Sequence, residues 1–267
     1  MNERCSGPKW PNLTPSRAGD LVCRKKFYEL HVLKSGPGEA FSQALVYGQA
    51  VHEVLKRVYG PVARVPVQQA NVEGIVSRVF AAYVYPDPAD READRLRCLA
   101  LAQAYIASDQ DAEATIGVEA FKSTPLSNGL GQLVLTLGAR FDRLLVRPNE
   151  PDCLVVRDYK TGKPGPADMQ AACLMLAIAR KQYPQYKTCL IEFDWVGAAG
   201  LMQRVTVTLA EAKEVWKDLK EAAMSVYFAT DFPAEPGEHC QFCPLKPGCQ
   251  PDHRATVEEI DAIFEQD

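Results

Sequence analysis

Two charged residues stand two positions apart where an apolar run near the middle of the chain ends. Asp158 and Lys160 follow Cys-Leu-Val-Val-Arg and precede a Thr-Gly turn. Because side chains alternate along a strand, a strand here would hold the carboxylate and the ammonium on one face. Asp142 lies in the preceding apolar run, which we expect to pair with this one. Two aspartates and a lysine at neighbouring strand ends indicate a site for Mg²⁺ or Mn²⁺, because these ions favour oxygen ligands.

The chemistry of such a site is attack on a phosphate. A bound divalent ion can polarise the phosphate and lower the pKa of a bound water, while Lys160 can stabilise charge in the transition state. An Asp-x-Lys triplet alone is more often a surface feature or an ordinary salt bridge. Other residues therefore have to support this hypothesis.

Two further segments give that support. Gly48 and His52 are four residues apart in a predicted helix, so they share one face. Glycine there permits close approach of another backbone, and His52 could then reach the ion as a nitrogen ligand. Gln170 stands near the start of a later predicted helix, whose N-terminus is suited to meet a phosphate.

Four cysteines form a second candidate site, split between the two ends of the chain. Cys23 stands alone, whereas Cys240, Cys243 and Cys249 form a Cys-x-x-Cys-x5-Cys cluster. In a reducing compartment, cysteines at this spacing are better interpreted as metal ligands than as disulfides. Four thiolates suit both zinc and an iron–sulfur cluster. If the four converge, the bound group joins the two ends of the protein.

Composition limits the remaining possibilities. Of 267 residues, 47% are hydrophobic, which is typical of a globular protein with a substantial core. The net charge of −4 does not by itself indicate a nucleic-acid binder, although Arg24, Lys25 and Lys26 form a local basic cluster. No apolar run is long enough to cross a membrane and no signal peptide is recognisable, so we expect a cytoplasmic protein. No Walker-type motif indicates a built-in helicase.

Periodicity and turn residues predict the elements that position these side chains. Helices are expected over 16–32, 41–59, 68–84, 90–108, 167–182 and 209–228, with a short acidic helix at the end. Strands are expected over 115–122, 132–147, 153–159, 188–196 and 202–208, the first three joined by antiparallel turns. We therefore expect one composite domain over 1–267, with a helical part (1–110), a catalytic α/β core (111–208) and a C-terminal helix with the cysteine loop (209–267).

Together these motifs resemble the RecB-like nucleases of the PD-(D/E)xK superfamily over nearly the whole chain. The resemblance is carried by Cys23-Arg-Lys-Lys-Phe-Tyr, Gly48-x-x-x-His52, Glu119, Phe141-Asp142-Arg143, Asp158-Tyr159-Lys160-Thr161-Gly162, Gln170 and the cysteines at 240, 243 and 249. It is similar to the iron–sulfur subgroup, which includes CRISPR-associated RecB-like exonucleases and the AddB nuclease domain. The resemblance implies a restriction-endonuclease-like α/β fold: a mixed central sheet flanked by helices, with N- and C-terminal arms joined by a four-cysteine metal cluster.

The same resemblance implies a function and a set of roles. The function is that of a metal-dependent DNA exonuclease acting on single-stranded ends in recombination, repair or CRISPR adaptation, with endonuclease activity also compatible. The implied ligands of Mg²⁺ or Mn²⁺ are His52, Asp142, Asp158 and the backbone carbonyl of Tyr159. Lys160 would be the catalytic lysine, and Gln170 would help to place the DNA. The implied ligands of a 4Fe-4S cluster are Cys23, Cys240, Cys243 and Cys249. A separate helicase, recombination or CRISPR adaptation partner is compatible with this.

The sequence departs from the family pattern at two positions. Leu174 stands where the glutamine motif usually has tyrosine, and Ala139 stands where glycine often precedes the motif aspartate, with Gly138 one position earlier. Two alternatives remain open. One is a non-cleaving module of the same fold that binds DNA ends or docks a partner. The other is a zinc-stapled protein in which the Asp/Lys cluster is structural.

Overall fold

The computed structural model of the chain describes residues 10–36, 42–60, 67, 70–127, 133–196 and 203–249. The chain divides into two compact units. The core unit comprises residues 12–15 and 39–217, and the cysteine unit comprises residues 1–11, 16–38 and 218–267. The expected single composite domain stays a prediction.

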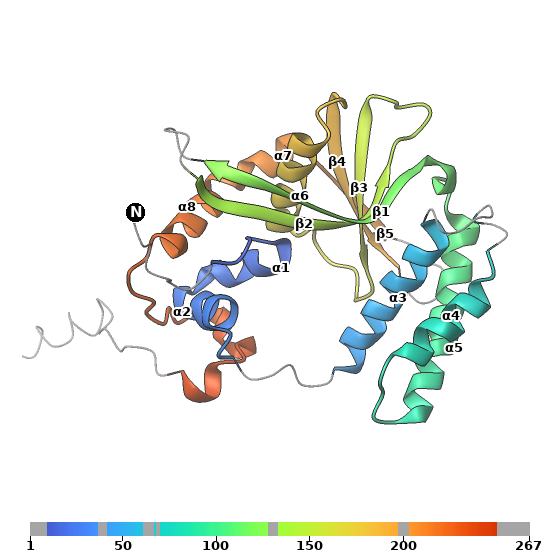
Figure 1. The fold of residues 1–267 in the computed structure, drawn as a ribbon, viewed down its shortest axis with the longest axis horizontal. Coiled ribbons are helices and arrows are strands. Elements are labelled where there is room, and N and C mark those ends of the chain that lie inside the picture. Colours follow the sequence, from blue (N-terminus) through green and yellow to red (C-terminus); the bar gives the residue numbers. More distant parts are fainter. Residues whose placement is uncertain are drawn as a thin grey trace, which may run out of the picture. The chain divides into compact units, whose positions relative to one another are not determined.

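A five-stranded mixed sheet forms the centre of the core unit (Figure 1). Its strands are β1 (Thr115–Ser127), β2 (Leu133–Leu145), β3 (Cys153–Lys160), β4 (Thr188–Trp195) and β5 (Gln203–Thr208). They lie in the order β1-β2-β3-β4-β5. The β1–β2, β2–β3 and β4–β5 pairs are antiparallel, whereas β3 and β4 are parallel. The predicted mixed sheet flanked by helices is therefore confirmed, as are the two antiparallel connections.

Helix α6 (Met169–Gln182) supplies the crossover that the parallel pair requires. It begins where the Asp168 carboxylate accepts a hydrogen bond from the Ala171 amide at 2.9 Å, and it follows a Pro-Gly-Pro segment. The helix packs against β1 through β4 and is buried along most of its length. Leu174 lies fully buried in it, so the residue at the family's tyrosine position contributes to the core.

Three helices form a second layer of the core unit: α3 (Gln43–Tyr59), α4 (Val72–Ala82) and α5 (Pro88–Ser108). Ser42, Asn71 and Asp87 cap their N-termini with side-chain oxygens. Helix α3 packs against α4, α5, β1 and β2, and its buried face shares an apolar core with Tyr159 of β3. This packing fixes α3 beside the sheet, which is where His52 is needed.

A buried network of charged side chains lies between β2, β3, β4 and the segment that follows α5. Arg143 and Arg157 have fully buried side chains. Arg157 donates to Glu192 at 2.7 Å and to Asp111 at 2.5 Å, and Arg143 donates to Asp109 at 2.7 Å. Buried charges are tolerated only when they are paired, and each of these two guanidiniums has carboxylate partners.

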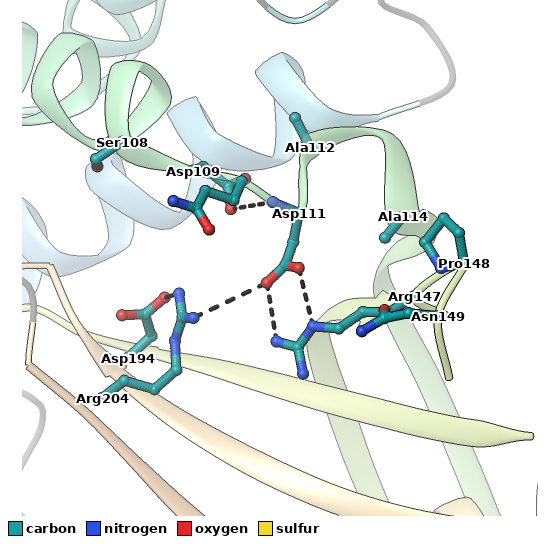
Figure 2. A pocket seen from close by; sticks show the side chains of 11 residues that line it. Ser108, Asp109, Asp111, Ala112, Ala114, Arg147, Pro148, Asn149, Asp194 and Arg204 are labelled. Atoms are coloured by element: carbon teal, nitrogen blue, oxygen red, sulfur yellow. Dashed lines mark hydrogen bonds and ion pairs between the residues drawn. The ribbon is translucent and has the colours of Figure 1, made fainter. Parts of the chain in front are cut away.

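The network opens into a cavity of about 850 Å³ beside the sheet, shown in Figure 2. The Arg147 guanidinium donates two hydrogen bonds, of 2.9 and 2.8 Å, to the Asp111 carboxylate. Arg204 donates a hydrogen bond of 2.9 Å to Asp194. Acidic and basic groups alternate here and largely satisfy one another. The network therefore locks the strand that carries Asp158 and Lys160 to its neighbours.

The helix predicted over 209–228 is divided in two. Helix α7 (Leu209–Glu214) begins with a capping box formed by Thr208 and Glu211, and α8 (Trp216–Tyr227) follows Val215. The amide of Val215 donates to the carbonyl of Lys213, two residues earlier, instead of to a carbonyl one helical turn back, so the regular helical ladder is interrupted there.

The cysteine unit brings both ends of the chain together. Its N-terminal part is a series of short turns: α1 (Pro15–Ala18), η1 (Gly19–Val22), α2 (Arg24–Phe27) and the π-helical η2 (Tyr28–Leu33). The prediction of one continuous helix over 16–32 was wrong, because Cys23 is extended and its sulfur caps α2. In a continuous helix the Cys23 side chain would instead project from the helix surface and could not cap α2.

Direct contacts join the two ends within this unit. Arg24 pairs with Glu235 at 3.2 Å, and the Lys25 amide donates to the Pro233 carbonyl. An aromatic cluster adds apolar contact, with Tyr28 and Phe232 stacked at 3.8 Å. The short turns η5 (Glu238–Phe242) and η6 (Lys246–Gly248) carry the C-terminal cysteines.

Two predicted features lie outside the described residues: the acidic helix after 250 and the tip of the β1–β2 turn at 128–130. Among the described helices, none has the length and apolar character that a membrane crossing requires.

Candidate active site

Three ligand-type side chains from three elements converge at one edge of the core unit. His52 comes from α3, Glu119 from β1 and Asp142 from β2, and one nitrogen or oxygen of each lies within 4.8 Å of the others. His52 Nδ1 is 3.3 Å from Asp142 Oδ1. All three line a cavity of about 460 Å³. One imidazole and two carboxylates form a donor set that a divalent ion can bind.

Asp142 also connects this cluster to β3. Its second oxygen, Oδ2, accepts a hydrogen bond from the Tyr159 amide at 2.8 Å. The same carboxylate therefore contacts His52 with one oxygen and fixes the Asp158-Tyr159-Lys160 strand with the other. The sequence predicted that Asp142 and Asp158 lie on neighbouring strands, and the β2–β3 pairing confirms this.

Asp158 and Lys160 lie side by side, as the strand alternation predicted. Lys160 Nζ is 2.5 Å from Asp158 Oδ2, and the Asp158 side chain is 10% exposed while that of Lys160 is 36% exposed. Burial and the neighbouring Asp142 carboxylate raise the pKa of Asp158 to about 6, although Lys160 opposes the shift. Two carboxylates that lie this close repel each other, which favours the arrival of a cation.

The pKa values of His52 and Glu119 are also raised. Burial opposes the charged form of His52, but its hydrogen bond to Asp142 and the nearby carboxylates raise the pKa of the imidazole. Burial, followed by repulsion from Asp142, raises the pKa of Glu119. The excess of negative charge in a half-buried place is the electrostatic condition that a divalent ion relieves.

Gly48 allows α3 to approach the segment after β3. A Cβ atom at this position would lie 3.0 Å from the Thr161 hydroxyl oxygen, closer than such atoms normally come. The close approach at Gly48 is therefore to the Thr161 side chain, whereas the sequence led us to expect another backbone there. This approach places His52, one turn further along α3, against Asp142.

Glu119 belongs to the cluster, although sequence reasoning assigned it no role. Val118 pairs with Arg143 and Ala120 with Phe141, so Glu119 stands opposite Asp142. Its backbone has a φ of 48°, which is unusual for a residue with a side chain. The register shifts between Thr115 and Gly117, just before this residue. Only the Val-Glu start of the strand hinted at Glu119 in the sequence, and the local distortion was not foreseeable.

The structure places the remaining expected residues less centrally. Gln170 lies half-buried in the first turn of α6, and no hydrogen bond among the described residues joins it to the acidic cluster. The Tyr159 side chain is buried in the apolar core with α3, which leaves its backbone at the site.

The four cysteines line one cavity of about 380 Å³, entirely within the cysteine unit. Cys23, Cys240, Cys243 and Cys249 all carry free thiols. His239 lines the same cavity, and its Nε2 is buried without a hydrogen-bond partner among the described residues. Cysteines from the two segments of this unit therefore line one cavity, and the metal cluster expected there stays a prediction.

Comparison with known proteins identifies the class. The family model of the PD-(D/E)XK nuclease superfamily matches residues 13–250, and the chain belongs to this superfamily. Nucleases of this superfamily use divalent metal ions, which agrees with the donor set formed by His52, Glu119 and Asp142.

Comparison with solved structures gives a match in fold at low sequence identity. A protein from Eubacterium rectale, provisionally assigned as an exonuclease, matches with a TM-score of 0.57 and 11% identity over 94% of this chain and 93% of that one. A protein called SSO0001 matches over 89% of this chain and 97% of its own at 14% identity. Its TM-score of 0.36 is too low to show a shared fold. The comparison with curated proteins found no match.

Proposed function

We propose that this protein is a metal-dependent DNA exonuclease that acts on single-stranded ends. The observation that carries the proposal is the convergence of His52, Glu119 and Asp142 directly beside the Asp158–Lys160 pair. A structural salt bridge would need neither the imidazole nor three mutually repelling carboxylates. The protein from Eubacterium rectale that shares this fold carries a provisional assignment as an exonuclease, which agrees with the proposal.

The residues present fit a divalent ion. Its proposed ligands are His52, Asp142, Asp158 and the Tyr159 carbonyl, and Glu119 joins them because its carboxylate lies within the same cluster. A divalent ion here would polarise the scissile phosphate and activate water for its attack. The buried carboxylates hold the ion, and the hydrogen bond from the Tyr159 amide keeps Asp142 oriented toward it.

Lys160 and Gln170 take the roles that act on the substrate. The Lys160 ammonium is anchored by Asp158 yet more than a third exposed, so it can present positive charge to a phosphate entering the site. Gln170, in the first turn of α6, is proposed to contact DNA beside the positive end of that helix.

The proposed setting follows the resemblance to RecB-like nucleases of the iron–sulfur subgroup. It comprises recombination, repair or CRISPR adaptation in the cytoplasm, with a separate helicase, recombination or adaptation protein as partner. The DNA substrate is the partner most directly supported, because the chain belongs to a nuclease superfamily.

A cleavage assay with matched variants tests the proposal. Linear single-stranded DNA labelled at either end, and closed single-stranded circles, are incubated with Mg²⁺, Mn²⁺ or EDTA. We expect metal-dependent release of short products from linear DNA, lost in Asp158→Asn and in Lys160→Ala. Full cleavage activity in either variant would refute the assignment of Asp158 and Lys160 to the nuclease active site.

The chain offers a matched control for both substitutions. Asp152 and Lys187 form another Asp–Lys ion pair of 2.5 Å, exposed and remote from the acidic cluster. Asp152→Asn and Lys187→Ala should therefore leave cleavage unchanged. If the wild-type protein binds DNA ends but cuts no substrate with either metal, the alternative of a non-cleaving end-binding or docking module holds instead.

We further propose that Cys23, Cys240, Cys243 and Cys249 hold a 4Fe-4S cluster. Four thiols from the two segments of this unit surround one cavity and fit such a group, and the buried His239 Nε2 beside them has no hydrogen-bond partner within the described part of the chain. The cluster would tie the two chain ends of the cysteine unit together. Zinc remains the competing occupant, since four thiolates also suit it.

Metal analysis and a visible spectrum separate the two occupants. Protein purified without oxygen should be brown, with a broad visible band and iron and acid-labile sulfide, and Cys243→Ser should lose all three. Cys98→Ser is the matched control, because Cys98 is buried in α5 of the core unit, outside this cavity. A colourless protein that contains zinc would overturn the cluster assignment and leave the nuclease assignment standing.

A further inference from the structure

The sheet surface next to the acidic cluster carries an exposed aromatic ring and an exposed guanidinium. Phe121 on β1 and Arg140 on β2 are directly paired across the antiparallel strands. Paired residues project to the same face of a sheet, so the two side chains are neighbours. Phe121 is 52% exposed, and the Arg140 side chain is 63% exposed. A single exposed aromatic residue is ordinary, so its surroundings decide what it can do.

Arg140 belongs to the candidate active site as well as to this surface. It lines the same cavity as His52, Glu119 and Asp142, and its Nη1 lies 3.4 Å from Glu119 Oε2. Arg140 precedes Asp142 by two residues on β2, a separation of about 7 Å along a strand. An ion pair this exposed is weak, so the guanidinium is available to another anion when a cation occupies the carboxylates.

The ring of Phe121 lies close to the backbone of Gly138. A Cβ atom on Gly138 would lie 3.2 Å from Cζ of the Phe121 ring and 3.4 Å from the Asn12 side chain. Glycine at this position therefore leaves room for the ring to lie close to the sheet. Strand β1 is at the edge of the sheet (Figure 1), so among the described residues it pairs with β2 alone.

We propose that Phe121 and Arg140 form a subsite for single-stranded DNA next to the candidate active site. Arg140 binds a backbone phosphate close to the one that is cleaved, and Phe121 stacks on a base of the adjoining nucleotide. Arginine suits the first task because its guanidinium binds phosphate through two parallel hydrogen bonds. The subsite rests on the proposed nuclease function and adds to it a structural reason for the choice of substrate.

The aromatic half of this subsite selects the form of the DNA. A base offers its flat face to a protein ring only when it is unstacked, as in a single strand or a frayed end. In an intact duplex the base faces are covered by their neighbours, so only the Arg140 contact with a phosphate remains. The pair thus favours single strands through Phe121, while Arg140 acts on both forms.

Binding measurements with single-residue variants test both halves. The probe is a fluorescent single-stranded oligodeoxynucleotide with phosphorothioate linkages, measured by anisotropy in Ca²⁺ with each variant. Phe121→Ala should weaken binding by about 5- to 150-fold, the range for losing one stacked base, and Phe121→Trp should retain it. Arg140→Ala should lower the slope of log affinity against log salt by about 0.7, the value for one phosphate contact on a single strand.

The controls are equally exposed residues that lack these surroundings. Ile116, 51% exposed, lies on the same strand as Phe121, and Arg57 forms an exposed ion pair on α3. Ile116→Ala and Arg57→Ala should leave both the affinity and the salt slope unchanged. Equal losses in these variants would mean that any change to this surface weakens binding, and the subsite would be refuted.

Probes that lack one base at a time distinguish base stacking by Phe121 from a purely structural role of this residue. A structural role would weaken binding to every probe equally. For the wild-type protein, one abasic position should weaken binding, and for Phe121→Ala the same position should be neutral, a coupling that a double-mutant cycle measures. If no position shows this coupling while the protein still cleaves single-stranded DNA, the subsite is wrong and the nuclease assignment stands. If the wild-type protein neither binds nor cleaves DNA, both are wrong.

Discussion

Replacing Arg157 with methionine should destabilise the core unit by about 3 kcal/mol. Arg157 is fully buried on β3 and donates to Glu192 at 3.0 and 2.7 Å and to Asp111 at 2.5 Å. Removing one partner from a buried ion pair typically costs about 3 to 5 kcal/mol, because the other charge stays buried and uncompensated. We expect the lower end, since Arg147 still binds both Asp111 and Glu192 in the variant.

The effect should also depend on pH, with a sign that the network fixes. Hydrogen bonds from Arg147 hold the pKa of Asp111 below its usual range, and Arg157 lowers the pKa of Glu192 despite its burial. Carboxyls with lowered pKa values stabilise the folded state above their unfolded pKa of about 4, and this contribution is lost as the pH falls further. The difference between wild type and Arg157→Met should therefore be largest at neutral pH and shrink below about pH 4.

Urea denaturation followed by circular dichroism measures this difference at several pH values. Lys187→Met is the matched control, because it removes a cation from an exposed ion pair and should leave the midpoint unchanged. A loss below about 1 kcal/mol in Arg157→Met at neutral pH, or a loss that stays constant into the acid range, would refute the reasoning, because either result means that the buried carboxylates need no cation.

Two other variants address the acidic cluster. Glu119→Gln should weaken Mn²⁺ binding by about tenfold or more in calorimetry, because it removes a negative charge from the donor set, whereas Glu150→Gln on an exposed turn should bind as wild type does. Gly48→Val should reduce cleavage strongly, because its side chain would push α3 and His52 away from Thr161. Gly162→Ala, with open space around its Cβ position, should cleave normally, and equal losses in both glycine variants would contradict this explanation.

The parts of the fold that depend on local signals could be predicted from the sequence. The alternation around Asp158 predicted that Lys160 shares its face, and turn residues predicted the two antiparallel connections. The spacing of Gly48 and His52 predicted a close approach of α3 to the site. Each of these follows from a period of two or of 3.6 residues, which requires no knowledge of distant contacts.

The parts that failed depend on contacts between distant residues. Apolar and basic residues over 16–32 have a helical period, yet the helix is interrupted at Cys23. The backbone is extended there, and Cys23 lines the same cavity as Cys240. Arg143 and Arg157 lie in strands that were interpreted as apolar, and their partners follow α5 or lie on β4. No local pattern identifies those partners, because the pairing is decided only when the sheet and helices have assembled.

The alternation of β3 explains why catalysis and stability are linked in this fold. Arg157 projects into the buried charge network, Asp158 toward the acidic cluster, and Tyr159 into the core shared with α3. A site that uses repelling carboxylates is unstable by itself, and burial together with repulsion from Asp142 raises the pKa of Asp158. The neighbouring residues on either side of Asp158 are both held by buried contacts, Arg157 in the charge network and Tyr159 in the apolar core. The carboxylate therefore stays in place until a cation arrives, which is the preorganisation that a metal-dependent nuclease requires.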